Sequence, residues 1–476
     1  MKIRTLKKLG LMTVLLFIIT SFHLNAQTKK ITIDEAIKIA IENNKENKIA
    51  LLNVEKADEA VDEAFGYALP VVDVSANYSR FVEKQKMPFP DFAALLGNAT
   101  YGILFDENVI PRDESKFKPV NYTLQSFSLA NNYQAQINVS QVLFNSAVLT
   151  GIGASKKYSN LSKEAFRSSA SKTILNVQKS FYGVILTKEL LEITKASLQN
   201  GEENLKNVKA YLSQGLVSEF DALQAEVRVE NIRPVVMQME NTYKIAKEGL
   251  KILLGLDQSE DIEVDGSISY TKEELPEKGE TINKALTTNI EIGVLELKKD
   301  VDKAFIDLER ADYWPTLAAF GNYTRAGSAE DFKFQNYSSA MVGLSFSMNL
   351  FKGLRTSHRE QQAKITAQQT EEQFFQLKDF VTMQVKTKIL DLERVQSNIE
   401  AQERNVKLAE RANEISQVRY KEGTGNQLEI QNADMALRQA RINKLQSEYD
   451  FMLAKFELDQ LLGKLEERFV KPYIEN

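Results

Sequence analysis

The amino-acid sequence predicts a membrane α+β protein: four β-strands per chain contribute to a barrel shared between chains, and long α-helical hairpins continue from it. Three observations predict this class. The 476-residue chain repeats the same order of landmarks in two halves. Residues 354–422 contain neither Gly nor Pro, a run far longer than the usual globular helix. Two segments in each half alternate apolar and polar residues over the length of an outer-membrane barrel strand.

The internal duplication defines the expected domain organisation. The matching landmarks are 32–36 with 281–285, 67–70 with 313–315, 142–145 with 349–352, and Gly215 with Gly423. The first repeat, 27–255, is expected to hold a helix, strands near 71–80 and 133–143, and a helical hairpin at 146–255. A strand and linker occupy 256–280. The second repeat, 281–464, holds a helix, strands near 316–324 and 341–350, and a hairpin at 353–463, before a tail at 465–476.

The first 26 residues have the pattern of a secretory signal peptide. Four basic residues precede the apolar run 9–22, and Leu24-Asn25-Ala26 forms a plausible cleavage site. The apolar run is too short to span a bilayer as a helix. We therefore expect an exported protein. Without this segment the net charge falls from −5 to about −9, which makes nucleic acid an unexpected partner.

The composition argues against a chemical active site. The chain has no cysteine, which excludes disulfides, thiolate metal sites and a lipid-anchored N-terminal Cys. Its two histidines are His23, inside the predicted signal peptide, and His358. Neither a nucleotide-binding loop nor a nucleophile constellation is present. The sequence therefore predicts no enzyme activity, no cofactor and no metal site.

Seven-residue spacing of apolar residues predicts coiled-coil packing of the long helices. In the first half the series is Val177, Val184, Leu191, Leu198, Leu205 and Leu212; in the second it is Val385, Leu392, Ile399 and Val406. The second hairpin turns at Gly423-Thr424-Gly425, and each half has a shorter preceding helix, Ile33 to about Leu69 and Ile282 to about Tyr313. Periodicity alone also fits a secreted or periplasmic coiled-coil scaffold or adhesion protein.

The alternating segments have one apolar face and one small polar face. The apolar faces are Val72, Val74, Ala76 and Tyr78; Tyr133, Ala135, Ile137 and Val139; and Val342, Leu344, Phe346, Met348 and Leu350. The segment at 316–324 is less regular, because Phe320 and Tyr323 fall on opposite faces. Aromatic residues stand at the strand ends, where membrane interfaces place them: Phe144, Trp314 and Phe351 on the helix side, and Tyr78, Tyr133 and Tyr323 on the far side.

Four strands cannot close a barrel, and lipid does not tolerate an open sheet edge. The barrel must therefore be shared, and two, three or four copies would give eight, twelve or sixteen strands. The strand pairs are joined by 81–130, which contains four prolines, and by the shorter 325–340. Both connections are expected to be extracellular. The long one is a lid, a receptor surface or an insertion, and insertion is the default expectation.

The chain resembles the TolC-like outer-membrane efflux proteins over essentially its whole mature length. The resemblance rests on the duplicated order together with Leu69-Pro70 and Trp314-Pro315 before the first strands, Leu143-Phe144-Asn145 and Leu350-Phe351-Lys352-Gly353 after the second, and the turns Gly215-Leu216 and Gly423-Thr424. It implies a homotrimer with one twelve-stranded barrel in outer-membrane lipid and a helical tunnel in the periplasm. It also implies a mixed equatorial belt that takes in 261–270 and helix starts at Thr32 and Thr281.

The resemblance further implies a passive exit duct, to which an inner-membrane pump and a periplasmic adaptor deliver the substrate. Acidic residues at Asp221 and Glu429 would line the periplasmic mouth, with Asn432 where the family has another acid, and select cations. Tyr420 matches a tyrosine that helps hold the mouth shut. The arginine expected nearby is Gly425, which puts the family's gating bonds in doubt. As an alternative, both acids stand at capping-box spacing from Ser218 and Asn426.

The two turns are expected to serve as docking tips. By the same resemblance, Gly215, Leu216, Gly423 and Thr424 contact the adaptor. A glycine just after a helix is otherwise an ordinary C-cap. Pro234 predicts a kink in the ascending helix of the first half that the second half lacks.

Overall fold

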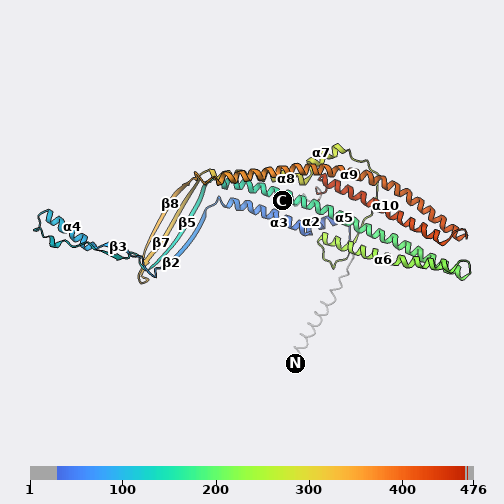
Figure 1. Cartoon of the computed structure of the whole chain (residues 1–476), viewed down its shortest axis with the longest axis horizontal. Helices are drawn as coiled ribbons and strands as arrows, with labels where there is room; N and C mark the ends of the chain where they lie inside the picture. The colour runs from blue at the N-terminus through green and yellow to red at the C-terminus, as the bar shows by residue number, and fades with distance from the viewer. Residues whose placement is uncertain (1–28, 467–468, 470–476) are drawn as a thin grey trace, which may run out of the picture. The chain divides into compact units, whose positions relative to one another are not determined.

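The computed structural model describes residues 29–466 and 469, so the predicted signal peptide lies outside the described residues. The chain divides into two compact units (Figure 1). The helical unit comprises residues 29–61, 154–305 and 362 onward, and the sheet unit comprises 62–153 and 306–361. Each unit combines segments from both sequence repeats, so the two repeats do not fold as separate domains.

The sheet unit contains four antiparallel strands in the order β2-β5-β7-β8. Their bounds are β2 Val71–Arg80, β5 Asn131–Asn145, β7 Thr316–Ala329 and β8 Gln335–Ser347. A bulge between Val142 and Phe144 interrupts the pairing of β5 with β7. The prediction of four strands per chain is confirmed. Within the described chain, the outer edges of β2 and β8 pair with no strand.

The register places the predicted apolar faces on one side of the sheet. Val74 pairs with Ile137, and Ile137 pairs with Tyr323. Because directly paired residues share a face, the apolar surface is continuous across the strands. Its members remain exposed, among them Val74 at 75%, Val342 at 87% and Leu344 at 70%. Phe320 lies on the polar face, where its ring covers the paired Gly343.

The second strand pair is longer than the sequence predicts. β7 continues past residue 324 to Ala329, and β8 begins at Gln335 and ends at Ser347. The 16-residue loop expected at 325–340 is therefore mostly strand. Consequently Tyr323 lies midway along β7 and not at its far end. Arg325 to Ala329 extend the strand through ladder pairing with β5 and β8, which a pattern of apolar residues does not reveal.

The connection 81–130 is folded. It forms a hairpin of β3 (Met87–Pro90) with β4 (Tyr122–Gln125) and a helix, α4 (Phe92–Asp106), followed by the short η1 (Glu114–Lys116). Asp91 caps α4 by accepting the N–H groups of Ala93 and Ala94. We call 81–130 the arm. Its prolines flank α4 and leave the helix itself free of proline.

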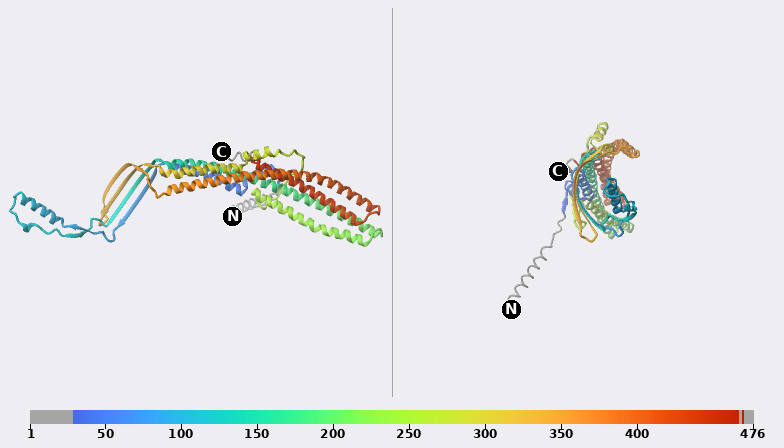
Figure 2. Two further views of the ribbon diagram at one scale, coloured as in Figure 1. Left: turned by 45° about the horizontal axis from the view of Figure 1, so that its top comes forward. Right: turned by 90° about the vertical axis from the view of Figure 1, so that its left-hand side faces the viewer.

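The helical unit is built on two hairpins whose helices run side by side in Figure 1 and in the left-hand view of Figure 2. One is α5 (Ser146–Ser213) with α6 (Glu219–Leu254), and the other is α9 (Arg355–Lys421) with α10 (Gln427–Leu461). Val385, Leu392 and Ile399 of the predicted repeat are buried. In α5 the repeat is buried as far as Leu191. Beyond that residue the buried positions shift to Thr194, Ser197, Gly201 and Val208. α6 runs through Pro234 as a single helix.

A belt of short elements packs on these hairpins. β1 (Lys29–Ile31) pairs in parallel with β6 (Ile262–Val264), the strand expected in the linker. Thr32 starts α2 (Ile33–Asn43) with a complete capping box to Glu35. The expected helix start at Thr281 is wrong, because α7 (Lys278–Thr288) begins earlier and Glu277 caps it.

The sequence predicts a single helix before the strands in each repeat, but the structure has two consecutive helices in each of these places. α2 is followed by α3 (Lys45–Gly66), and α7 is followed by α8 (Ile290–Arg310) and the short η2 (Ala311–Tyr313). An asparagine stands at each break. The Nδ2 of Asn44 donates to Leu253 O at 2.9 Å, and that of Asn289 donates to Leu461 O at 3.1 Å. The two repeats thus use the same device to fasten a helix break to the end of the ascending helix.

Candidate functional site: the hairpin tips

The two turns at the hairpin tips share one backbone geometry. Gly215 N–H donates to Leu212 O and Leu216 N–H to Tyr211 O. Gly423 N–H donates in the same way to Tyr420 O, and Thr424 N–H donates to Arg419 O. Both glycines are left-handed, at φ 73° and 71°, as Schellman C-caps require. Leu216 and Thr424 are exposed at the tips.

Asp221 closes the capping box that its spacing predicts. Its carboxylate accepts from Ser218 N–H at 3.1 Å and from Ser218 Oγ at 2.6 Å, and its own N–H donates back to Ser218 Oγ. The carboxylate keeps further acceptor capacity because the cap uses a single oxygen. The cap and a role in the pore are therefore compatible.

Glu429 lies in a different environment from Asp221. Its N–H donates to the capping Asn426 Oδ1 at 2.9 Å, and its carboxylate lies 3.2 Å from the guanidinium of Arg419. Arg419 also donates to Thr424 O across the turn. A Cβ on Gly425 would lie 3.1 Å from Arg419 Cβ and from Tyr420 N. The absence of a side chain at Gly425 permits the close approach of Arg419 to this turn.

Tyr420 and Asn432 differ in burial. Tyr420 packs against the small cluster of Val208, Ala222 and Ala225 that belongs to the other hairpin. Its pKa lies above the ordinary tyrosine value because burial removes water and because Asp221 is nearby. Its hydroxyl has no hydrogen-bond partner in the described part of the chain. Asn432 is exposed.

A buried ion pair joins the two hairpins above the tips. Arg228 of α6 contacts Asp434 of α10, and Ser197 Oγ of α5 donates to the same carboxylate at 3.0 Å. Arg228 is 5% exposed and Asp434 is 7% exposed. We call these three residues the inter-hairpin triad. Sequence reasoning missed it, although a signal existed: Arg228 interrupts the buried stripe Ala222, Ala225, Ile232, and Asp434 interrupts Ile430, Leu437.

Near the tips, several buried polar side-chain atoms have no hydrogen-bond partner among the residues described. Asn204 Nδ2, Asn413 Oδ1, Tyr420 Oη and both amide atoms of Gln427 are buried without a partner among the residues described. Gln427 is only 1% exposed. An unsatisfied buried polar atom costs about 1–3 kcal/mol.

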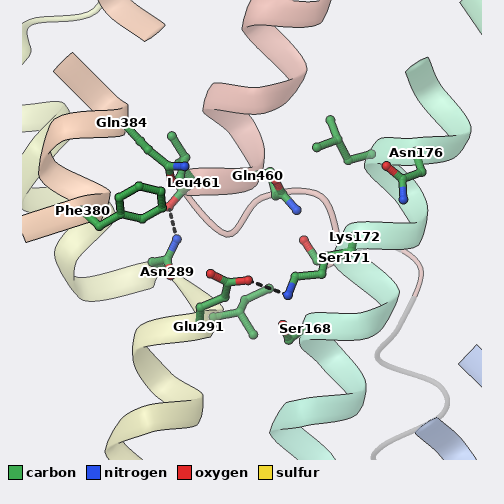
Figure 3. Close-up of a pocket in the computed structure, with 12 residues that line it drawn as sticks. Ser168, Ser171, Lys172, Asn176, Asn289, Glu291, Phe380, Gln384, Gln460 and Leu461 are labelled. Atoms are coloured by element: carbon green, nitrogen blue, oxygen red, sulfur yellow. Dashed lines mark hydrogen bonds and ion pairs between the residues drawn. The ribbon is translucent and has the colours of Figure 1, made fainter. Parts of the chain in front are cut away.

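A polar cavity of about 360 Å³ lies where α10 ends, beside the middle of α5 and α9 (Figure 3). Lys172 of α5 and Glu291 of α8 form an ion pair across it at 2.7 Å, and Asn289 reaches Leu461 O at its wall. Both charges in the cavity are compensated. The arrangement holds the start of α8 on α5 and presents no nucleophile or metal ligand set.

The aromatic residues predicted for the membrane interface belong to the sheet unit. Tyr78 and Tyr133 pair directly across β2 and β5 at the far end of the sheet. Their hydroxyls donate to Asn131 and Asn336. On the helix side Trp314 is 62% exposed, Phe351 79% and Phe144 38%. Tyr323, 47% exposed, lies on the apolar face in mid-strand.

Two features are absent from the residues that the structure describes. No helix among residues 29–466 is both long and apolar enough to cross a membrane. No group of three or more metal-ligating side chains comes together in this range.

Comparison with known proteins identifies the family. The model of the outer membrane efflux protein family matches residues 36–256 and 281–464. The chain belongs to this family. The two matched ranges correspond to the two sequence repeats. Family membership places the protein in the outer membrane of a Gram-negative bacterium, as a duct for efflux or secretion and not as an enzyme.

Curated relatives and solved structures agree with this assignment. The chain is 21% identical over 341 residues to outer membrane protein TolC of Vibrio cholerae, covering 71% of this chain and 78% of the relative. It is 22% identical over 351 residues to the alkaline protease secretion protein AprF of Pseudomonas aeruginosa, covering 71% of each. The Campylobacter jejuni CmeC outer membrane channel superposes with a TM-score of 0.72 at 15% identity, covering 93% of this chain and 89% of that one. The protein therefore has the TolC-like fold.

Proposed function

We propose that the protein forms a homotrimeric exit duct through the outer membrane, working with a periplasmic adaptor and an inner-membrane pump. One observation carries the proposal: among the residues that the structure describes, the edges β2 and β8 of the sheet pair with no further strand, and its apolar face is exposed. Lipid requires every backbone polar group to be paired, so further copies must cover these edges. Family resemblance selects three copies and twelve strands.

The strand order allows the ring to close with antiparallel pairing between neighbouring copies. β2, β5, β7 and β8 alternate in direction because each adjacent pair is antiparallel. β8 of one copy therefore meets β2 of the next in antiparallel orientation. The contact is head to tail and can repeat until the ring closes. We expect the detergent-solubilised protein to have the mass of three chains and to conduct ions in planar bilayers. Recovery as a soluble monomer without detergent would instead support a coiled-coil scaffold.

The tips supply the periplasmic end of the proposed duct. Asp221 and Glu429, repeated by threefold symmetry, would form rings of carboxylates that favour cations. The adaptor would contact Leu216 and Thr424, which are exposed beside the glycine caps. A photo-cross-linking residue at position 216 should capture a periplasmic protein in cells. Capture of periplasmic proteins at the same level from a distant exposed position such as Glu393 would argue against specific docking at the tips.

We expect the two acids to contribute unequally to cation selection. Asp221→Asn should weaken block by a trivalent cation severalfold, whereas Glu429→Gln should have the smaller effect because Arg419 already compensates Glu429. Arg419→Gln should strengthen block by freeing that carboxylate. Single-channel recordings with increasing cation concentration measure each effect.

Ser218→Ala is the matched control for Asp221, because it removes the capping hydroxyl and retains the acid. It should cost about 1 kcal/mol of helix stability and leave block unchanged. If Ser218→Ala weakened block as much as Asp221→Asn, the acid would act as a helix cap and not as a pore charge.

A further inference from the structure

The apolar face of the sheet carries two arginines toward its far end. The four strands contain three charged side chains, Asp73, Arg80 and Arg325. Asp73 belongs to the polar face. Arg80 ends β2 on the apolar side of its alternation, and Arg325 pairs with Ala135 of the apolar face. Both arginines are exposed, and neither guanidinium has an ion-pair or hydrogen-bond partner in the part of the chain that the structure describes.

The strand register gives the depth of Arg325 in the proposed barrel. Phe144, expected at the inner interface, pairs with Leu317, and Tyr133, expected at the outer interface, pairs with Gly327. Ten residues at about 3.4 Å each and a tilt of about 40° rise about 26 Å, which matches an apolar band of about 25 Å. Arg325 precedes Gly327 by two residues and therefore lies about 5 Å inside the band. Its flexible stem can carry the guanidinium outward to the headgroups.

Small residues leave the sides of Arg325 open. Its row across the sheet holds Ala76, Ala135 and Ser338. Ser338 pairs directly with Arg325, so the Cβ atoms of the two residues are about 5 Å apart on the same face. The hydroxyl of Ser338 is exposed and has no hydrogen-bond partner among the described residues. A cation and a hydroxyl donor thus stand together in an otherwise apolar surface.

We propose that Arg325 and Ser338 bind the phosphate of a lipid headgroup in the outer leaflet, with Arg80 as a second cationic contact above them. The inference rests on the proposed barrel, which turns this face toward lipid. A guanidinium presents paired N–H donors that match phosphate oxygens, and the serine hydroxyl adds another donor. A charge at this depth is costly unless it reaches the interface or finds a counter-charge. The phosphate supplies that counter-charge.

The strand order and the charges exclude two other sources of negative charge. β7 lies between β5 and β8, so the next copy, which covers only the edges β2 and β8, does not pair with the strand of Arg325. Asp73, the one acid of the four strands, is on the opposite face. At the rim, Glu330 already pairs with Lys84. Lipid is therefore the remaining source of negative charge on this face.

The first test compares two substitutions that remove the same charge. Native mass spectrometry of detergent-solubilised trimers with added lipid A, a bisphosphorylated glycolipid, measures the affinity for lipid. Arg325→Gln should weaken binding about tenfold or more, because hydrogen bonds to a charged group are lost. Lys333→Gln, in the turn between β7 and β8, should leave binding nearly unchanged. Equal affinities of the wild type and Arg325→Gln, or equal losses in the two variants, would overturn the proposal.

Removal of the lipid phosphates and addition of free phosphate identify the group that is bound. The wild type should bind dephosphorylated lipid A no better than Arg325→Gln does, and millimolar inorganic phosphate should not displace the phosphorylated lipid. Wild-type binding that is unaffected by dephosphorylation would overturn the proposal. Displacement by inorganic phosphate would show a site for free anions and would overturn the assignment to a headgroup.

A depth measurement tests the position of this row in the membrane. The chain has no native cysteine, so a bimane probe can be placed on Ser338→Cys or on Val342→Cys, four residues deeper along β8. In nanodiscs, a nitroxide at the headgroup should quench the probe at 338 more strongly, and a nitroxide near the acyl end should quench the probe at 342 more strongly. A probe at 338 that neither nitroxide quenches would place Arg325 outside the membrane and overturn the proposal. If the wild-type protein is trimeric and conducts but these lipid results fail, only the lipid inference is lost; a wild-type monomer would refute the ring itself.

Discussion

Removing one partner of the inter-hairpin triad should cost about 3–5 kcal/mol of unfolding free energy, because the remaining charge would stay buried without compensation. Asp434→Ala leaves the Arg228 guanidinium 5% exposed between the hairpins, and Arg228→Ala leaves the carboxylate with only the hydroxyl of Ser197. Replacing both residues by leucine should recover most of the loss, since buried ion pairs often exchange for apolar residues at little cost. Chemical unfolding followed by circular dichroism measures all three variants.

The matched control is an exposed ion pair on one of the same hairpins. Arg233 lies 2.8 Å from Glu202, and both side chains are about half exposed. Arg233→Ala should cost less than about 1 kcal/mol of unfolding free energy.

The triad lies between the hairpin tips and the apolar core, so the single triad variants should also raise the resting conductance of the channel. If the double leucine variant were as unstable as the single variants, the pairing argument would be wrong.

Gly463→Ala should destabilise the belt by at least about 3 kcal/mol. Gly463 follows α10 with a φ of 62°, and an added Cβ would lie 2.2 Å from the carbonyl oxygen of Thr288. That atom is backbone at the end of α7, so relief requires α7 and α10 to separate. Gly255, after α6, has the equivalent position in the first repeat, with Asn43 O at 2.4 Å.

Gly353 distinguishes backbone strain from the steric contact as causes of this loss of stability. It has nearly the same φ, 63°, but an added Cβ would meet no atom within 4 Å. Gly353→Ala should therefore cost only the backbone strain, about 1–2 kcal/mol. The difference between the two variants in thermal unfolding isolates the steric contact. Equal losses would show that the approach of α10 to α7 is unimportant.

The features predicted from the sequence are those set by local periodicity. The two-residue alternation fixed which faces of β2, β5 and β8 are apolar, and the pairing register then aligned them. The uninterrupted run 354–422 became α9. Ser218 and Asp221 formed the cap that their spacing indicates. Each of these depends on residues close in sequence.

The features that were missed depend on contacts between distant segments. At Asn44 and Asn289 the side-chain oxygen caps the following helix, while the side-chain amide bonds a carbonyl 209 and 172 residues away, respectively. Arg228 and Asp434 pair across 206 positions. In the arm, the sequence predicts no helix between the four prolines, which flank α4 and leave its interior intact. The ion pair of Arg419 with Glu429 likewise depends on the turn geometry.

The most direct test of the duct is a disulfide between β2 of one copy and β8 of the next. The chain has no native cysteine. Ser75→Cys should be combined in turn with cysteine at Ser339, Met341, Gly343 and Ser345, which share its face of the sheet through the register. We predict that one of these combinations gives a covalently linked trimer that reduction converts to monomers. Val74→Cys, on the opposite face, should give none. Cross-linking within single chains, or no linkage between chains at any register, would contradict the shared barrel.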